Sequence, residues 1–92
     1  MLNENPTIFV GGFGPFLGES ELQKYFCKYG EILKIILKRD MEKGINKGYA
    51  FVKFSDPKSV QEILKSSHML DGRHIDVAVA HSGQKKDEDM TY

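Results

Sequence analysis

The sequence has no tryptophan, a single cysteine and no net charge. Because Cys27 has no second cysteine to pair with, an internal disulfide is excluded, and its place in an apolar helical pattern predicts a buried thiol in a reducing compartment. No apolar run approaches the roughly 20 residues that cross a bilayer. The N-terminus also lacks the basic start and apolar stretch of a signal peptide. We therefore expect an intracellular protein that makes no membrane contact.

A net charge of zero gives no bulk signal for a nucleic-acid partner, but the basic residues are unevenly distributed. Residues 34–53 hold six basic side chains and only two acidic ones, Asp40 and Glu42. The basic ones are Lys34, Lys38, Arg39, Lys43, Lys47 and Lys53. Charge alone leaves two interpretations open, a solvated hairpin with ordinary lysines or a surface for an anionic partner.

Two amphipathic helices are predicted from the spacing of apolar residues. Leu22, Tyr25, Phe26 and Tyr29 follow i, i+3, i+4 and i+7 spacing, which predicts a helix from near Glu19 to Gly30. The second begins with Asp56 as N-cap and Pro57 in its first turn. Its buried face is predicted at Val60, Ile63 and Leu64, and its end near Ser66.

Four strands are predicted around these helices, at residues 7–10, 31–38, 47–54 and 75–80. A polar turn over residues 39–46 joins the middle two, and a turn at Asp71-Gly72 precedes the last. The resulting β-α-β-β-α-β order predicts an α+β, ferredoxin-like fold. Its four-stranded antiparallel sheet carries two helices on one face and leaves the other face open.

Aromatic side chains are predicted on that open face. In the third strand Ala50, Val52 and Phe54 share one parity, so if they form the core, Tyr49 and Phe51 point outward. In the first strand, Ile8 and Val10 similarly place Phe9 on the outer face. Exposed aromatics on neighbouring strands are costly without a ligand, which makes them candidate binding residues.

The third strand also carries a family motif. Residues 47–54, Lys-Gly-Tyr-Ala-Phe-Val-Lys-Phe, match the octamer K/R-G-F/Y-G/A-F-V-x-F/Y of the RNA recognition motif (RRM) family at every specified position. Residues 8–13, Ile-Phe-Val-Gly-Gly-Phe, resemble the family's shorter hexamer. The chain is thus similar to RRM domains over about residues 7–81, with residues 1–6 as an N-terminal extension and 82–92 as a polar tail.

The resemblance implies that Phe9, Tyr49 and Phe51 stack on bases or a ribose and that Lys47 contacts a phosphate. Strand parity adds Ile36, Lys38 and Lys53 to the same face as supporting residues. Gly11 is expected to permit close backbone approach, as are Gly12 and Gly48, although a glycine in a strand can also mark only a bulge. Phe13 and Phe16 in the first loop are predicted to pack in the core.

Within the family, the chain resembles the heterogeneous nuclear ribonucleoprotein A/B and Musashi group. Those domains commonly carry lysine or arginine where this chain has Ala78 and Val79, so we expect weaker affinity from this domain alone. The resemblance implies single-stranded RNA binding by one module of an RNA-processing or mRNA-regulatory protein, in the nucleus, the cytoplasm or both. We expect a monomer, with an adjacent RRM or a protein as a further partner.

Other functions require residues or spacings of their own. No enzyme is expected, because loop 11–18 has no basic residue and fits no phosphate-binding pattern. No metal and no cofactor are expected, because His68, His74, His81 and Cys27 lack metal-ligand spacing, and the three histidines are explained as surface or turn residues. An RRM with a protein partner stays open as an alternative, and so does single-stranded DNA, because stacking does not distinguish the sugar.

Overall fold

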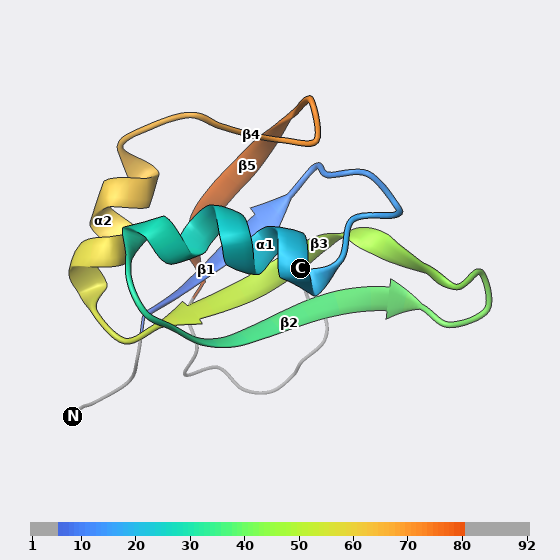
Figure 1. Ribbon diagram of the computed structural model, residues 1–92, viewed down its shortest axis with the longest axis horizontal. Helices are drawn as coiled ribbons and strands as arrows, with labels where there is room; N and C mark the ends of the chain where they lie inside the picture. Colours follow the sequence, from blue (N-terminus) through green and yellow to red (C-terminus); the bar gives the residue numbers. More distant parts are fainter. Residues whose placement is uncertain (1–5, 81–92) are drawn as a thin grey trace.

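Five strands and two α-helices make up residues 6–80, the part of the chain that the computed structural model describes (Figure 1). In chain order they are β1 (Thr7–Gly11), α1 (Glu19–Phe26), a 3₁₀ turn (Cys27–Tyr29), β2 (Ile32–Asp40), β3 (Ile45–Phe54), α2 (Pro57–Leu64), β4 (His68–Leu70) and β5 (Arg73–Ala80). The predicted β-α-β-β-α-β order is confirmed. Strand β5 corresponds to the predicted last strand, and β4 is an additional short strand before it.

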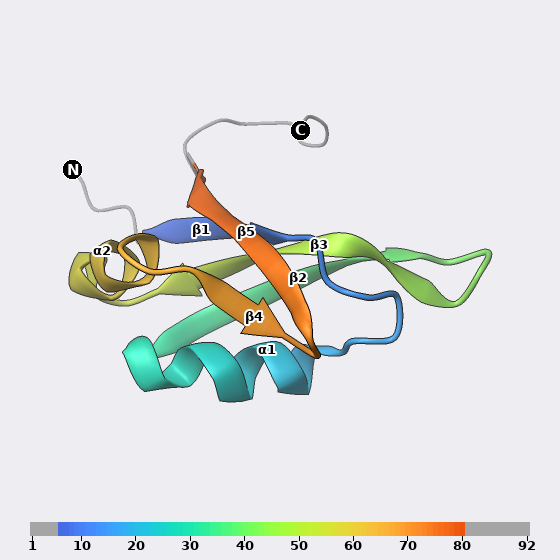
Figure 2. The ribbon, with the colours of Figure 1, turned by 90° about the horizontal axis from the view of Figure 1, so that it is seen from above.

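The strands form one antiparallel sheet in the order β2-β3-β1-β5-β4. Figure 2 shows α1 lying along one side of this sheet. Alternate residues of β1 and β3 are fully buried beneath the helices, and they meet apolar side chains from both helices in a single core. Its fully buried members are Ile8, Val10, Leu22, Phe26, Ala50, Val52, Phe54 and Ile63. The predicted division of the two sheet faces is therefore correct for β1 and β3.

Strand β4 was not expected from the sequence. It pairs with the start of β5 through a two-residue turn, Asp71-Gly72, in which both residues have positive φ (55° and 75°). Asp-Gly is a typical sequence for such tight hairpin turns, because both positions need a residue that tolerates positive φ. The pairing turns His68 inward, where it is 2% exposed. Its interpretation as a surface or turn residue is therefore wrong, whereas His74 is exposed.

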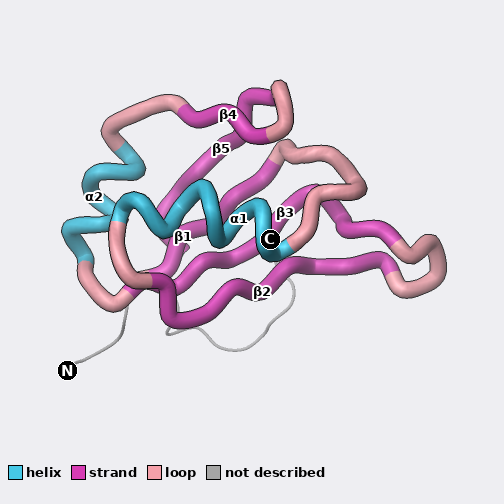
Figure 3. Tube along the Cα trace, viewed as in Figure 1, coloured by secondary structure: helices cyan, strands magenta, loops and turns pink. Residues whose placement is uncertain are grey.

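The β2–β3 hairpin is longer than predicted, because the strands extend to Asp40 and Ile45 and leave a short loop between them (Figure 3). Asp40 organises that loop. Its carboxylate accepts hydrogen bonds from the backbone N–H groups of Glu42 and Lys43 (3.1 and 3.3 Å), and its carbonyl accepts one from Gly44 (2.9 Å). Gly44 has a φ of +71°, which glycine adopts without a steric cost. The loop therefore closes tightly.

Both helix starts agree with the sequence interpretation. The Asp56 side chain accepts a hydrogen bond from the backbone N–H of Lys58 (2.9 Å), as an N-cap does, and Pro57 follows it. The first helix changes to a 3₁₀ turn at Cys27. The Cys27 side chain is exposed, so the expected buried thiol is wrong. Leu22 and Phe26 are four residues apart and share the core face of the helix, whereas Cys27, one residue further on, lies outside that face.

Several sequence-based expectations lie outside the described residues. These are the N-terminal extension apart from Pro6, His81, and the tail at 82–92. Among the described residues, no helix is long and apolar enough to cross a membrane, and no three potential metal-ligating side chains lie close together.

Candidate nucleic-acid interface

Three aromatic rings lie in mutual contact on the sheet face that the helices leave uncovered. Phe9 on β1 pairs directly with Phe51 on β3, and Tyr49 lies two residues further along β3, opposite Gly11. The ring centroids of Phe9 are 5.9 Å from those of Tyr49 and 5.8 Å from those of Phe51, in stacked and edge-to-face geometry respectively. The Tyr49 and Phe51 centroids are 6.1 Å apart. The rings therefore form one continuous aromatic cluster.

Alternation along β3 positions two of these rings. Ala50, Val52 and Phe54 are fully buried on the helix side, so Tyr49 and Phe51 face the other way, as the sequence predicted. All three rings are only half-buried, and their contacts with one another account for part of that burial. Ring pairs in these geometries attract, which holds the cluster in place before any ligand arrives.

Gly11 determines where the Phe9 ring lies. A Cβ atom at position 11 would lie 2.8 Å from Cζ and 2.9 Å from Cε2 of Phe9, closer than such atoms can approach. The ring therefore occupies the space that a side chain at this position would fill. The bulge that the sequence left open for Gly11 is absent, because β1 keeps an unbroken register with both neighbours. The space at Gly11 is filled by the Phe9 side chain rather than by an approaching backbone.

Basic side chains border the rings on the side of β2 and β3. Ile36 pairs with Phe51 and is 41% exposed, and Lys53 follows on the same face. Lys38 and Lys47 lie next to the Arg39–Asn46 pair, at the hairpin end of the cluster. The three predicted supporting residues, Ile36, Lys38 and Lys53, and the predicted phosphate contact Lys47 thus border the rings along β2 and β3. Sequence reasoning missed Lys34, which is exposed and pairs with Lys53, although it shares the parity of Ile36.

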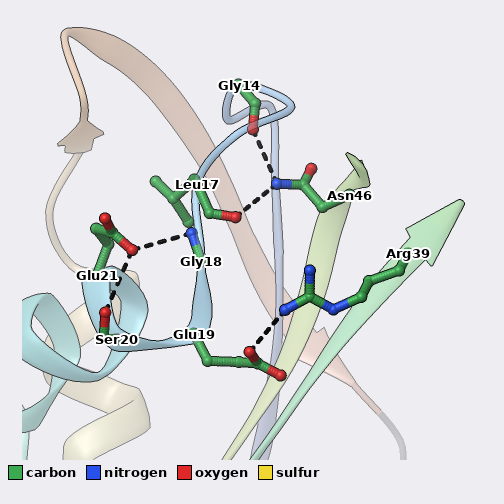
Figure 4. A network of polar contacts seen from close by, with 8 residues as sticks. All are labelled: Gly14, Leu17, Gly18, Glu19, Ser20, Glu21, Arg39 and Asn46. Carbon is green, nitrogen blue, oxygen red and sulfur yellow. Dashed lines mark hydrogen bonds and ion pairs between the residues drawn. The ribbon is translucent and has the colours of Figure 1, made fainter. Parts of the chain in front are cut away.

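The loop between β1 and α1 presents a further aromatic. Phe13 is buried, as predicted, but Phe16 is 86% exposed, so its assignment to the core is wrong. The physical reason is Asn46, which is 4% exposed and fixes the loop against β3. Its Nδ2 donates hydrogen bonds to the carbonyls of Gly14 (3.0 Å) and Leu17 (2.7 Å), as Figure 4 shows. The loop is thereby turned so that Phe16 points into solvent.

Further polar contacts attach this loop to α1 and β2. The Glu21 carboxylate accepts a hydrogen bond from the backbone N–H of Gly18 (3.0 Å), and this bond lowers the pKa of Glu21. Arg39 on β2 forms an ion pair with Glu19 at the start of α1 (2.8 Å; Figure 4). Arg39 therefore points toward the helix side and does not belong to the basic set around the rings.

The fold and the ring cluster together define a sheet-surface binding domain with aromatic and basic side chains on its open face. Comparison with known proteins gives its family. Residues 8–76 match the family model of the RNA recognition motif. The chain therefore belongs to the RRM family.

Curated relatives agree with this assignment. The chain is 37% identical over 75 residues to heterogeneous nuclear ribonucleoprotein 27C of Drosophila melanogaster, covering 80% of this chain and 18% of that protein. It is 37% identical over 73 residues to nuclear polyadenylated RNA-binding protein 4 of Saccharomyces cerevisiae, covering 79% of this chain and 14% of that protein. The chain thus spans less than a fifth of the length of either relative.

A solved structure is similar as well. The RNA-binding domain of Hrp1, solved in complex with RNA, superposes with a TM-score of 0.77 at 36% sequence identity, covering 82% of this chain and 45% of that one. A second RNA-bound structure, the Rna15 RRM, gives a TM-score of 0.73 at 20% identity and supports the fold alone.

Proposed function

We propose that this domain binds single-stranded RNA on the open face of its sheet, with Phe9, Tyr49 and Phe51 stacking on bases or a ribose. The observation that carries the proposal is the contact of these three rings with one another on the face that α1 and α2 leave uncovered. Every base has a π-face that an aromatic ring can stack on. Because paired bases are not available for stacking, the proposed ligand is single-stranded.

The basic residues are proposed to hold the phosphate backbone. Lys34, Lys38, Lys47 and Lys53 lie along β2 and β3, so a strand whose bases stack on the rings has cations within reach of its phosphates. Ile36 would pack against a base or a ribose beside Phe51. Gly11 acts indirectly, by making room for the Phe9 ring.

The wider role follows from the relatives. Two of them are named as a nuclear ribonucleoprotein and a polyadenylated RNA-binding protein, which supports a module of an RNA-processing or mRNA-regulatory protein, nuclear or cytoplasmic. We propose binding rather than catalysis, by a monomeric domain spanning residues 7–81. Ala78 pairs with Phe9 and offers no cation there, so β5 contributes little to RNA affinity. A neighbouring domain would add affinity.

A backbone-amide NMR titration with a random single-stranded RNA pool tests the surface. Shifts are expected at residues 8–11, 36–38, 47–53 and 78–80, with both helices nearly unaffected. Double-stranded RNA should give much weaker changes. Shifts confined to α1 and α2 would reject the sheet as the binding surface.

The Phe51→Ala variant tests the stacking mechanism. Loss of one base stack should weaken RNA binding by about 1–3 kcal/mol. Leu64→Ala is the control, because it truncates an apolar side chain on α2, away from the rings. Leu64 is 41% exposed, so its predicted place on the buried face of α2 is wrong. If folded Phe51→Ala binds RNA as tightly as the parent, the ring cluster is not the site and a protein partner becomes the leading alternative. Equal affinity for single-stranded DNA of the same sequence would remove the preference for RNA.

A further inference from the structure

The open face of the sheet is electrostatically asymmetric about the rings. Among residues 6–80 its lysines lie on β2 and β3, whereas the ionisable side chain nearest to the rings on β5 is a carboxylate, that of Asp76. Asp76 is exposed, and the neighbours Ile75 and Val77 are buried and half-buried, so alternation places Asp76 on the open face. The β2–β3 side of the ring cluster is therefore cationic, whereas the β5 side presents the Asp76 carboxylate, with His74 two residues away on the same face.

Register places Asp76 beside the Phe9 ring. Gly11 pairs with Tyr49 on one side and with Asp76 on the other. Since the Phe9 ring lies over Gly11, it sits between Tyr49 and Asp76. Residues directly opposite in an antiparallel pair have Cα atoms about 4.5–5.5 Å apart. A base stacked on Phe9 would therefore bring one of its edges within reach of the Asp76 carboxylate.

The chemistry of a carboxylate restricts what it can contact in RNA. Ionised aspartate only accepts hydrogen bonds, and it repels phosphate. Within the part of the chain that the structure describes, Asp76 makes no ion pair or hydrogen bond through its side chain, so its oxygens are available. The phosphates would run over the lysines of β2 and β3, which turns the base edges toward β5 and Asp76.

On the basis of the RNA-binding function proposed above, we propose that Asp76 selects guanine as the base stacked on Phe9. Guanine presents two adjacent donors, N1–H and the 2-amino group, which match the two oxygens of one carboxylate. Adenine and cytosine each present one amino group beside a ring nitrogen that only accepts. Uracil presents one N–H between two carbonyl oxygens, which the carboxylate repels. Asp76 is thus a specificity-determining residue, separate from the rings that supply stacking.

The test compares short uridine oligonucleotides that carry one central guanosine, inosine or adenosine, or none, by fluorescence anisotropy. Wild-type protein should prefer the guanosine oligonucleotide to the all-uridine one by at least about fivefold, the lower end of the discrimination given by a bidentate contact. Inosine, which keeps N1–H but lacks the 2-amino group, should fall between them. Asp76→Asn should lose most of this preference and bind the all-uridine oligonucleotide at least as tightly as wild type.

Two controls separate this inference from the proposed function. Glu62→Gln removes the same charge from α2 and should keep the guanosine preference. Phe51→Ala should weaken binding of every oligonucleotide. A guanosine preference that survives in Asp76→Asn, or that is missing in wild type, would overturn the role of Asp76 and leave RNA binding intact. Failure of wild type to bind any of the oligonucleotides would overturn both.

Discussion

The ring of Phe9 lies where the side chain of residue 11 would be, 2.8 Å from the place of its Cβ atom, and only glycine leaves that space free. The residue at position 11 of β1 therefore sets the position of a ring on the proposed binding surface. The ring contacts those of Tyr49 and Phe51 on β3, and its position depends on the absence of a side chain at residue 11. Gly11 is thus a positioning residue for the aromatic cluster.

Gly11→Ala should weaken RNA binding without unfolding the domain. The new methyl group displaces the Phe9 ring, but β1 is a regular strand at this point, and glycine within a strand is itself unfavourable. We expect a loss of up to about 1–3 kcal/mol in binding, the value of one stack. Anisotropy measures the affinity and thermal unfolding measures the stability.

A double-mutant cycle checks the cause. In a Phe9→Ala background, Gly11→Ala should cost almost nothing further, because the ring that it displaces is already gone. Full additivity of the two losses would show that Gly11 acts by a route other than Phe9.

Lys47→Ala should change the salt dependence of binding more than its specificity. One phosphate contact on a single strand contributes about 0.7 to the slope of log affinity against log salt, so the slope should flatten by roughly that amount. Lys58→Ala, on α2, is the matched control and should leave the slope unchanged. If both variants give the parent's slope, Lys47 contacts no phosphate.

The binding face was predictable because it follows from local patterns. Ala50 and Val52 alternate with Tyr49 and Phe51 along β3, so the two pairs point to opposite faces of the sheet. The aliphatic pair is buried under the helices, and the aromatic pair is left on the open face. The pairing of Phe9 with Phe51 then follows from the order of the strands. Lys34 was predictable in the same way, because it lies after the register irregularity that follows Ile32 and shares the parity of Ile36.

The first loop was not predictable in the same way. Whether Phe16 is buried depends on Asn46, which is 30 positions away in sequence and holds the carbonyls of Gly14 and Leu17 by hydrogen bonds. Nothing in the loop's own composition distinguishes Phe13 from Phe16. Likewise, the inward turn of His68 depends on a three-residue strand whose pairing is set by the Asp71-Gly72 turn.

The two loop phenylalanines should therefore differ in their contribution to stability. Phe13→Ala removes a buried ring and should destabilise the domain by about 3–5 kcal/mol, as such core truncations do. Phe16→Ala removes an exposed ring and should change the stability by no more than about 0.5 kcal/mol. Urea unfolding of both variants measures the difference, and similar losses in the two would contradict the loop geometry.

Tyr25 and His68 form a partly buried hydrogen bond that links α1 to β4 and should make the domain sensitive to alkaline pH. The His68 Nε2 lies 2.7 Å from the carbonyl of Ile63 and must donate to it, so in the neutral imidazole Nδ1 accepts from the Tyr25 hydroxyl at 2.7 Å. Burial, with a smaller contribution from Tyr29, raises the pKa of the Tyr25 phenol above its ordinary value of 10.0. The folded state therefore holds this proton more tightly than the unfolded state does. The resulting stability is fully present below about pH 10 and is lost as pH rises through the folded-state pKa.

Tyr25→Phe should lower stability at neutral pH by about 1–3 kcal/mol, because Nδ1 of His68 loses its donor in a buried site. The free energy of unfolding should also decline less steeply above about pH 10 than in the parent, because the variant has no phenol at residue 25 to ionise. Tyr49→Phe is the matched control, since it removes a hydroxyl from the sheet face without touching His68. The urea midpoint measured across this pH range decides the matter. Parallel declines in the parent and Tyr25→Phe would mean that the Tyr25 proton does not contribute to folding.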